Sequence, residues 1–286
     1  MVYRFLRLIY DTHWGPLYYL VWSVILTDNF FTKSLICELV SNTHVNGEVF
    51  ILQFSWGGPA PKAGQFFMVK PLRTSVFLPR PISVFDYSDA KNTVRFLIAR
   101  KGMGTDELSQ MNTGEKAQLT GPLGNCWAEF LPENGMTALV GGGVGVAPLA
   151  ALVSERPEHN FHFYAGFRNG FREKEEETAM LGSALCAKKL IVSAEDGKNA
   201  PGGRIVDFLL EPENYSVIFA CGPEPMLKAV IKKCEAKGIP CYVSLERRMA
   251  CGAGACLGCT VRTAKGNRRC CVDGPVFSAG ELIFDE

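Results

Sequence analysis

The segment 251–271 constrains the fold more than any other part of the chain. Cys251, Cys256 and Cys259 follow the spacing C-x4-C-x2-C, and the adjacent pair Cys270 and Cys271 comes later. This is the plant-type spacing of a [2Fe-2S] cluster, which takes four thiolates from the protein. The residues between the first three cysteines are mostly glycine and alanine, so the backbone can bend at positive φ and bring N–H groups close to the cluster sulfurs. The pattern therefore predicts an iron–sulfur centre near the carboxyl end.

Two other interpretations of this segment are weaker. A structural zinc site normally pairs two C-x2-C units, and this segment contains a single one. A disulfide framework suits exported proteins, whereas this chain shows no export signal. The residues alone leave the fourth cluster ligand open between Cys270 and Cys271.

Length and composition indicate an ordinary globular protein with more than one domain. The chain has 286 residues, of which 47% are hydrophobic and 21% charged. A net charge of +1 gives no reason to expect a nucleic-acid partner. The 11 cysteines are an odd and mostly scattered set. Such a set favours a reducing compartment, and we expect a cytoplasmic protein.

Residues 1–31 need a separate interpretation. Arg4 and Arg7 precede an apolar run from Trp14 to Leu26, which is shorter than the roughly 20 residues of a transmembrane helix. No Ala-x-Ala-like cleavage site follows the run. We expect a disordered or loosely packed extension that need not belong to the native protein. An amphipathic helix on a membrane surface is the alternative.

Residues 32–133 show the pattern of an antiparallel β-barrel. Short apolar segments rich in β-branched and aromatic residues are separated by turn sequences such as Asn46-Gly47. The clearest predicted strands are Ser34–Val40, Val49–Phe54, Gln65–Lys70 and Val94–Ala99.

The pattern changes in residues 134–242, where strands alternate with helices and a parallel sheet is expected. The predicted strands are Thr137–Val140, Phe161–Ala165, Leu190–Ser193, Val217–Cys221 and Cys241–Ser244. Val146–Glu155 and Pro225–Lys237 are predicted helices. The fold class is therefore α+β and multidomain: a β-barrel, a parallel α/β domain, and a small cluster domain at 243–286.

Three motifs in the barrel segment are candidates for contact with a phosphate-bearing ligand. Arg80-Pro81-Ile82-Ser83 offers a guanidinium fork and a hydroxyl on a stiffened strand, although by itself it fits an Arg-Pro turn on the surface at least as well. Gly102 to Thr105 permits close backbone approach to a pyrophosphate, and Thr105 is predicted to be a helix N-cap. The turn Gly121 to Asn125 has a structural and a functional interpretation of equal weight.

Two glycine turns in the α/β segment indicate a nucleotide cleft. Gly141 to Gly145 follows a strand and opens a helix, and Cys221-Gly222-Pro223 ends another strand, so both turns should face one crevice. The strict dinucleotide fingerprint is absent. The acidic residue expected after the strand Phe161–Ala165 is replaced by Gly166-Phe167-Arg168, and Arg168 leaves NADP open as a ligand.

Taken together, these motifs in residues 32–286 resemble the electron-transfer subunits of NAD-linked (class 1B) dihydroorotate dehydrogenase, within the ferredoxin-reductase-like superfamily. The most specific stretch runs from Leu245 through Cys271 to Phe277, whereas the glycine turns are shared across the superfamily. Residues 1–31 have no counterpart in the family pattern.

The resemblance implies a set of cofactor contacts. It implies four cluster ligands, and it places the fourth at Cys271, directly before the acidic-Gly-Pro turn. It implies FAD in the barrel and NAD in the α/β domain, with Cys221 near the nicotinamide. The cluster ligands would be Cys251, Cys256, Cys259 and Cys271; the FAD contacts Arg80, Pro81, Ile82, Ser83, Leu97, Ile98, Ala99, Gly104 and Thr105; the NAD contacts Gly142, Gly143 and Cys221.

The resemblance also implies a function and a partner. Electrons would pass from the FMN of a separate catalytic subunit, where dihydroorotate is oxidised, through the cluster and FAD to NAD+ in pyrimidine biosynthesis. The assembly would be a heterotetramer of two copies of each subunit. A cluster that exchanges electrons with another protein must lie near a surface, so Glu246, Arg247 and Arg248 could help form the contact, although a solvated basic patch is the preferred interpretation of these residues. We expect no catalytic acid, base or nucleophile, because the cofactors perform the chemistry.

Two alternatives remain open at this stage. The first is a related flavin/iron–sulfur reductase subunit of the ferredoxin:NADP or sulfide-linked kind. Those relatives tend to replace one cluster cysteine with an acidic residue, and all four cysteines are present here. The second is a non-catalytic metal-binding regulator that uses the barrel as a binding module.

Overall fold

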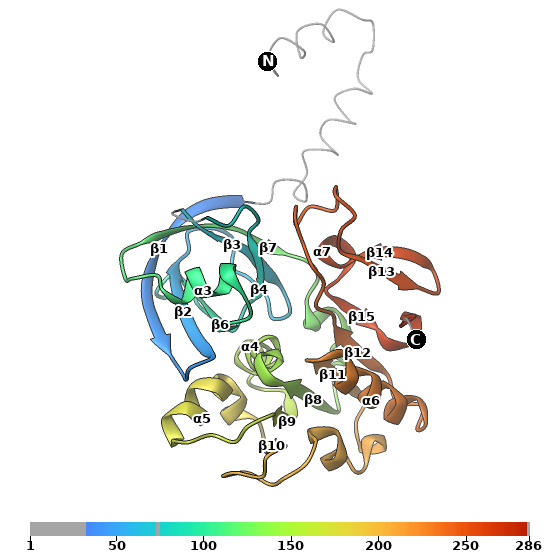
Figure 1. The fold of residues 1–286 in the computed structure, drawn as a ribbon. Coiled ribbons are helices and arrows are strands. Elements are labelled where there is room, and N and C mark those ends of the chain that lie inside the picture. The colour runs from blue at the N-terminus through green and yellow to red at the C-terminus, as the bar shows by residue number, and fades with distance from the viewer. Residues whose placement is uncertain (1–32, 73–74, 285–286) are drawn as a thin grey trace, which may run out of the picture. The chain divides into compact units, whose positions relative to one another are not determined.

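Antiparallel pairing of short strands builds the segment from Lys33 to Leu123, as predicted (Figure 1). The computed structural model describes residues 33–72 and 75–284, so the expectations for residues 1–31 lie outside the described part. The seven-stranded sheet has the order β4-β3-β7-β1-β2-β6-β5. Its strands are β1 (Lys33–His44), β2 (Val49–Ser55), β3 (Phe66–Pro71), β4 (Arg80–Ser83), β5 (Asp86–Ser88), β6 (Thr93–Ala99) and β7 (Lys116–Leu123).

Strand β1 bends this sheet into the barrel shape. Its residues 33–38 pair with β7, whereas its residues from Leu39 onward pair with β2, and the register shifts between Leu39 and Ser41. Such an irregularity bends a strand and increases its twist. The inner face is filled by large aromatic side chains, among them Trp56 and Phe67, whose rings meet edge to face at 4.8 Å. The barrel therefore has its own hydrophobic core.

The second half contains a six-stranded sheet of order β10-β9-β8-β11-β12-β15, in which the first five strands are parallel. Three helices, α4 (Ala147–Glu155), α5 (Lys174–Leu181) and α6 (Glu224–Glu235), follow strands of this sheet. Its strands are β8 (Met136–Gly142), β9 (Asn160–Phe167), β10 (Lys189–Ala194), β11 (Val217–Cys221), β12 (Cys241–Ser244) and β15 (Val276–Ser278). The chain order reverses between β8 and β11, which is where ligands bind in sheets of this type.

Strand β15 comes from the segment assigned to the cluster domain, and it pairs antiparallel with β12. The same segment also contains a two-stranded sheet and a short helix: β13 (Thr260–Thr263), β14 (Gly266–Arg269) and α7 (Cys270–Asp273). The segment 243–286 therefore shares a sheet with the α/β region. The barrel side carries one more helix, α3 (Met103–Ser109).

Short 3₁₀ turns complete the described elements. They are η1 (Trp127–Phe130), η2 (Gly143–Val146), η3 (Gly182–Cys186), η4 (Ile205–Phe208), η5 (Pro212–Asn214) and η6 (Ala279–Glu281). No helix within residues 33–72 and 75–284 has both the length and the apolar character to span a membrane.

Two local predictions were wrong. Thr105 is not the N-cap of α3, because the helix begins at Met103 and its N-cap is Gly102. The side chain of Thr105 instead accepts a hydrogen bond from the backbone N–H of Lys101 at 2.8 Å. The glycine turn after β8 is also shorter than predicted, because the strand continues through Gly142 and α4 begins only at Ala147.

Candidate functional site

The cysteine loop, which we define as residues 251–259, folds so that backbone N–H groups point at sulfur atoms. The N–H groups of Ala253 and Cys256 lie 3.4 and 3.5 Å from the Cys251 sulfur, and the N–H of Gly254 lies 3.2 Å from the Cys271 sulfur. Gly252 and Gly254 adopt φ values of 66° and 74°, which favour glycine. The cysteine loop therefore has the predicted geometry, in which glycines at positive φ allow backbone N–H groups to approach the cysteine sulfurs.

These contacts shift the thiol pKa values. Burial opposes ionisation of Cys251, but hydrogen bonds from the backbone N–H groups of Ala253 and Cys256 outweigh it and lower the pKa to about 7. Burial, together with a hydrogen bond to the Cys259 side chain, raises the pKa of Cys271 to about 12. The loop therefore brings Cys271 next to Cys259, although the two are far apart in sequence.

Cys270 and Cys271 have different surroundings, although they are adjacent in α7. The Cys270 thiol is fully buried and donates a hydrogen bond to the carbonyl oxygen of Leu245 at 3.2 Å. Burial also raises its pKa to about 12. Cys271 instead contacts the cysteine loop through Gly254. Of the two adjacent thiols, only that of Cys271 therefore contacts the cysteine loop, and its role as the fourth ligand stays a prediction.

The described cysteines of this region lie in two pairs. The Cys251 side chain interacts with that of Cys256, and the Cys271 side chain interacts with that of Cys259. In a [2Fe-2S] cluster each iron takes two protein thiolates, so a pairwise arrangement is compatible with such a group. Within the described ranges, no group of three His, Cys, Asp or Glu side chains is placed to hold a single metal ion.

The cysteine loop packs directly on the barrel. A Cβ atom at Gly252 would lie 2.8 Å from Met68 Cγ and 3.1 Å from Leu123 Cδ1, so the loop backbone lies against strands β3 and β7. Met68 pairs with Pro81 in the neighbouring strand β4. Only one strand therefore separates the cysteine loop from the Arg80–Ser83 motif.

Asn125 connects the barrel to the segment that follows Cys271. Its side chain donates to the carbonyl oxygen of Val276 at 2.8 Å and accepts from the N–H of Val276 at 3.0 Å. Its own backbone N–H donates to the carbonyl oxygen of Gly274 at 2.7 Å. At Gly124 a Cβ atom would lie 2.6 Å from that same oxygen. The role of the turn 121–125 was open from the sequence. In the structure, this turn holds the barrel against residues 274–276.

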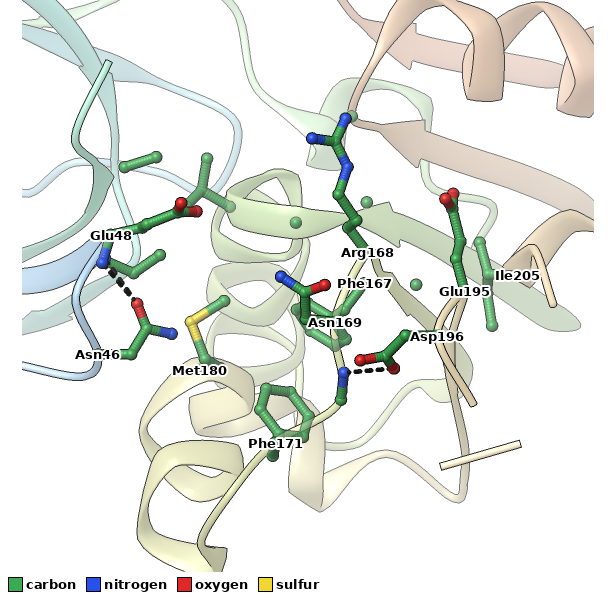
Figure 2. Close-up of a pocket in the computed structure, with 18 of the residues that line it drawn as sticks. Asn46, Glu48, Phe167, Arg168, Asn169, Phe171, Met180, Glu195, Asp196 and Ile205 are labelled. Carbon is green, nitrogen blue, oxygen red and sulfur yellow. Dashed lines mark hydrogen bonds between the residues drawn. The ribbon is translucent and has the colours of Figure 1, made fainter. Parts of the chain in front are cut away.

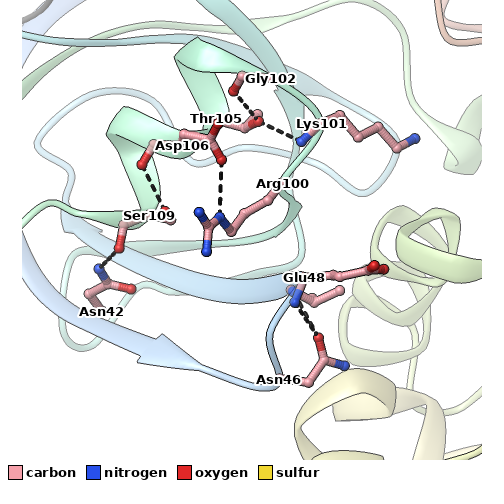
Figure 3. Close-up of polar contacts among 10 residues, drawn as sticks. Asn42, Asn46, Glu48, Arg100, Lys101, Gly102, Thr105, Asp106 and Ser109 are labelled. Atoms are coloured by element: carbon pink, nitrogen blue, oxygen red, sulfur yellow. Dashed lines mark hydrogen bonds and ion pairs between the residues drawn. The ribbon is translucent and has the colours of Figure 1, made fainter.

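Arg80 lies against the start of α3. A Cβ atom at Gly104 would lie 2.2 Å from Arg80 Nε, so the guanidinium group of Arg80 rests against the helix backbone at this position. No carboxylate pairs with Arg80 within the described part of the chain; its Nη1 donates to the carbonyl oxygen of Leu78 at 2.9 Å. Figure 3 shows the neighbouring polar contacts, including Thr105 Oγ1 donating to Gly102 O at 2.9 Å. The guanidinium therefore forms hydrogen bonds only to backbone carbonyl oxygens within the described residues, and its position beside the start of α3 is compatible with the predicted pyrophosphate contact.

The remaining predicted flavin contacts lie on two strands. Pro81, Ile82 and Ser83 are half-buried along β4. On β6, Leu97 and Ile98 are buried and Ala99 is half-buried at the strand end. Ala99 also lines the large cleft that is described in the next paragraph, so strand β6 of the barrel reaches the edge of that cleft.

A cleft of about 1300 Å³ extends between the barrel hairpin at residues 45–49 and the carboxyl ends of the parallel strands (Figure 2). Gly142 and Gly143 line it, as predicted, and so does Gly222. A Cβ atom at Gly222 would lie 3.0 Å from the Cα atom of Gly142, so the two glycine turns do meet at one crevice. At Gly145 a Cβ atom would lie 2.4 Å from the Cys221 carbonyl oxygen, which explains why the turn after β8 requires glycine there.

Cys221 lies beside the cleft but does not line it. Its side chain is 4% exposed in the core at the end of β11, while the next residue, Gly222, faces the cleft. Burial raises the pKa of the Cys221 thiol to about 12, so the group stays protonated at neutral pH. Its predicted place near the nicotinamide stays a prediction.

Sequence reasoning missed several residues that line the cleft. Asn46 Nδ2 donates to Glu176 Oε1 at 2.7 Å and so joins the barrel hairpin to α5. Glu195 and Asp196 follow β10 and line the same end of the cleft as Arg168. The signal for these two carboxylates was available, since only Ala194 separates them from the predicted strand Leu190–Ser193 of a parallel sheet.

The comparisons with known proteins agree with this geometry. Residues 246–283 match the family described as the iron-sulfur cluster binding domain of dihydroorotate dehydrogenase B. The chain is 39% identical over 225 residues to the dihydroorotate dehydrogenase B (NAD(+)) electron transfer subunit of Clostridium acetobutylicum, covering 79% of this chain and 87% of that one. The subunit of the same name from Caldanaerobacter subterraneus is 37% identical over 252 residues, with coverages of 86% and 97%.

Solved structures show the same fold. The structure of an NADH-dependent reduced ferredoxin-NADP oxidoreductase, solved to study flavin-based electron bifurcation, is similar with a TM-score of 0.72 and 26% identity. The similarity covers 88% of this chain and 91% of that one. A ferredoxin NADP+ reductase from Neisseria gonorrhoeae, with bound FAD and NADP, has a TM-score of 0.59 at 17% identity over 77% of this chain and 96% of its own, and it supports the fold alone.

Proposed function

The chain belongs to the family of dihydroorotate dehydrogenase B (NAD(+)) electron transfer subunits, and on that premise we propose that it carries electrons from a dihydroorotate-oxidising catalytic subunit to NAD+ in pyrimidine biosynthesis. The observation that carries the proposal is the packing of a four-cysteine site directly against a flavin-type barrel that opens onto a nucleotide cleft. A protein that holds a cysteine site, a flavin-type barrel and a nucleotide cleft in one unit is suited to passing electrons between cofactors and not to acid–base chemistry.

Three groups belong to this function: a [2Fe-2S] cluster, FAD and NAD. When bound, they supply one-electron exchange at the cluster and two-electron exchange between flavin and nicotinamide. The thiolates of Cys251, Cys256, Cys259 and Cys271 would hold the cluster, and the N–H groups of Ala253 and Gly254 would stabilise charge on its sulfurs.

The barrel residues would bind and orient the flavin. The Arg80 guanidinium and the backbone at Gly104 would hold its pyrophosphate, with Thr105 fixing the preceding turn. Pro81, Ile82 and Ser83 on β4, and Leu97, Ile98 and Ala99 on β6, would form the wall against which the rest of the flavin lies. Gly142 and Gly143 would approach the NAD pyrophosphate, with Cys221 behind the nicotinamide end.

The partner would contact the surface around the cysteine loop. Leu257 and Val272 are 62% and 47% exposed there, beside Cys256 and Cys271. Exposed apolar side chains next to a redox site favour docking of another protein. We infer a catalytic subunit with its own FMN as that protein, in a heterotetramer of two copies of each subunit. The 11 cysteines form no disulfide in the described residues, which supports a cytoplasmic location.

Reconstitution tests this function. The chain, loaded with iron, sulfide and FAD, is mixed with a dihydroorotate-oxidising flavoprotein encoded beside it, and NADH formation from dihydroorotate and NAD+ is followed by absorbance. We expect NADH to form with both proteins present and not with either alone, and light scattering to give the mass of two plus two subunits. Iron-free material that supports the same rate would contradict the proposal.

A second candidate is a reductase that exchanges electrons with ferredoxin, because the most similar solved structure reported above comes from such an enzyme at 26% identity. The same preparation distinguishes the two. NADPH- or NADH-linked reduction of ferredoxin at a higher rate than the dihydroorotate-linked reaction would favour the second candidate.

A further inference from the structure

The end of the cleft beyond β9 and β10 carries two opposite charges side by side. In the parallel pairing of these strands, Ala194 lies in register with Phe167. The backbone hydrogen bonds continue past the strand ends: Glu195 N–H donates to Phe167 O at 3.0 Å and Asp196 N–H to Arg168 O at 3.2 Å. Continuing the same register places Glu195 beside Arg168. Because side chains alternate along a strand, both project from one face of the sheet, and Figure 2 shows them extending in the same direction.

Neither charged side chain is engaged by another group. Within residues 33–72 and 75–284, the carboxylate of Glu195 and the guanidinium of Arg168 form no hydrogen bond or ion pair. Both residues are exposed and both line the cleft. They are therefore available to a ligand that reaches this end.

Asp196, in contrast, is committed to holding the two loops together. Its Oδ1 accepts hydrogen bonds from the N–H groups of Gly170 at 2.9 Å and Lys198 at 3.0 Å. The Asn199 side chain donates to Phe171 O at 2.7 Å. At Gly170 a Cβ atom would lie 1.5 Å from the Lys198 carbonyl oxygen, so the loops are in direct backbone contact. Asp196 thus fixes the backbone from which Glu195 projects.

The chemistry of a free carboxylate at this position distinguishes two ligands. A carboxylate accepts hydrogen bonds from both hydroxyls of a ribose, which is how dinucleotide sites of this general kind recognise NAD. It repels the 2′-phosphate that distinguishes NADP. Arg168 and Lys198, which also line the cleft, would favour the phosphate, so Glu195 is the carboxylate that opposes them after Asp196 has been committed to the loop backbone. The acidic residue that the sequence lacks after β9 is thus supplied by the neighbouring strand.

We propose that Glu195 is the residue that selects NAD over NADP, by binding the adenosine ribose hydroxyls and repelling a 2′-phosphate. This inference rests on the proposed function, since it assumes that the cleft binds a nicotinamide dinucleotide. In this inference Arg168 favours NADP, because it can bind the 2′-phosphate. The relative affinity of the cleft for NAD and NADP then depends on both neighbouring side chains, Glu195 and Arg168.

The test uses the flavin-loaded protein with an artificial electron acceptor. The ratio of kcat/KM for NADH to that for NADPH is measured for the wild type, for Glu195→Gln, and for Glu158→Gln. Glu158 is an exposed carboxylate just before β9, at the opposite end of the sheet, and provides the same change in charge. We expect Glu195→Gln to lower the ratio at least about tenfold, through a lower KM for NADPH, and Glu158→Gln to change it less than about twofold.

A binding measurement gives a second readout that does not depend on turnover. Calorimetric titration with 2′,5′-ADP and with AMP reports the phosphate preference directly, and we expect only Glu195→Gln to bind 2′,5′-ADP more tightly than the wild type does. Unchanged ratios and affinities in Glu195→Gln would overturn the inference while leaving the proposed function intact. If neither dinucleotide reduced the flavin in the wild type, the proposed function would fail as well.

Discussion

Replacing Asn125 with alanine should loosen the attachment of the cysteine region while the barrel stays folded. The substitution removes two hydrogen bonds, of 2.8 and 3.0 Å, and leaves the N–H and C=O of the buried residue Val276 without partners. Each such loss costs about 1–2 kcal/mol, so the total is about 2–4 kcal/mol. With a urea dependence of about 2–3 kcal/mol per M, the transition in which the cysteine region separates should shift by about 1 M.

The assay follows three signals during urea titration of the cofactor-loaded protein. Visible circular dichroism reports the cluster, flavin fluorescence reports FAD release, and far-ultraviolet dichroism reports the backbone. In Asn125→Ala the cluster signal should disappear at lower urea than the flavin signal, because the lost contacts join the barrel to the residues just after Cys271. Reduction of the cluster by NADH should also slow relative to reduction of the flavin.

Asn42 provides a matched control. Its side chain donates two hydrogen bonds of 2.9 Å to the carbonyl oxygens of Ser109 and Met111, all within the barrel region. Asn42→Ala therefore removes the same side chain and the same number of bonds without touching the cysteine region, and it should shift the flavin signal instead. If both variants moved all three signals together, the reasoning that Asn125 acts as a local attachment would be refuted.

Two further predictions concern single residues. Cys256→Ser should abolish the visible spectrum of the cluster but keep the reduction of the flavin by NADH. Cys270→Ser should keep the cluster spectrum, because the Cys270 thiol contacts Leu245 and not the cysteine loop. Loss of the spectrum in Cys270→Ser would instead identify Cys270 as the fourth ligand. Burial lowers the pKa of His162 below its ordinary value of 6.5, so its contribution to stability is complete above that pH and lost as the pH falls through the folded-state pKa. His162→Gln should therefore flatten the decline in urea midpoint below about pH 6.5, and an unchanged decline would exclude this group as its source.

Much of the fold could be predicted because local patterns specify it. All four predicted barrel strands and all five predicted parallel strands exist, since alternation and apolar runs depend only on which faces of a strand are buried. Helix boundaries were less accurate. Thr105 has a suitable side chain for an N-cap, but Gly102 can adopt a φ of 157° and starts the helix earlier.

The identity of the cysteine site was also accessible from the sequence, because ligand spacing within one loop is a local property. The residues alone did not decide between Cys270 and Cys271. The proposal of Cys271 came from a family resemblance, and it agrees with the structure, in which α7 turns the Cys270 thiol toward Leu245 and the Cys271 thiol toward Gly254. Adjacent helical residues point in different directions, so their environments depend on what each face packs against.

What the sequence could not give is the set of contacts between distant segments, and these contacts relate the three sites to one another. β15 joins the parallel sheet through β12, and directly before it Gly274 contacts Asn125 of the barrel. Gly252 lies against Met68, whose strand is paired with the Arg80–Ser83 motif. A side chain at Gly252 would push the cysteine loop away from the barrel, although nothing in the local spacing of the cysteines forbids it. The glycine is therefore required by a surface that lies about 180 residues earlier in the chain, and only the folded structure shows that close approach of the cysteine loop to the barrel.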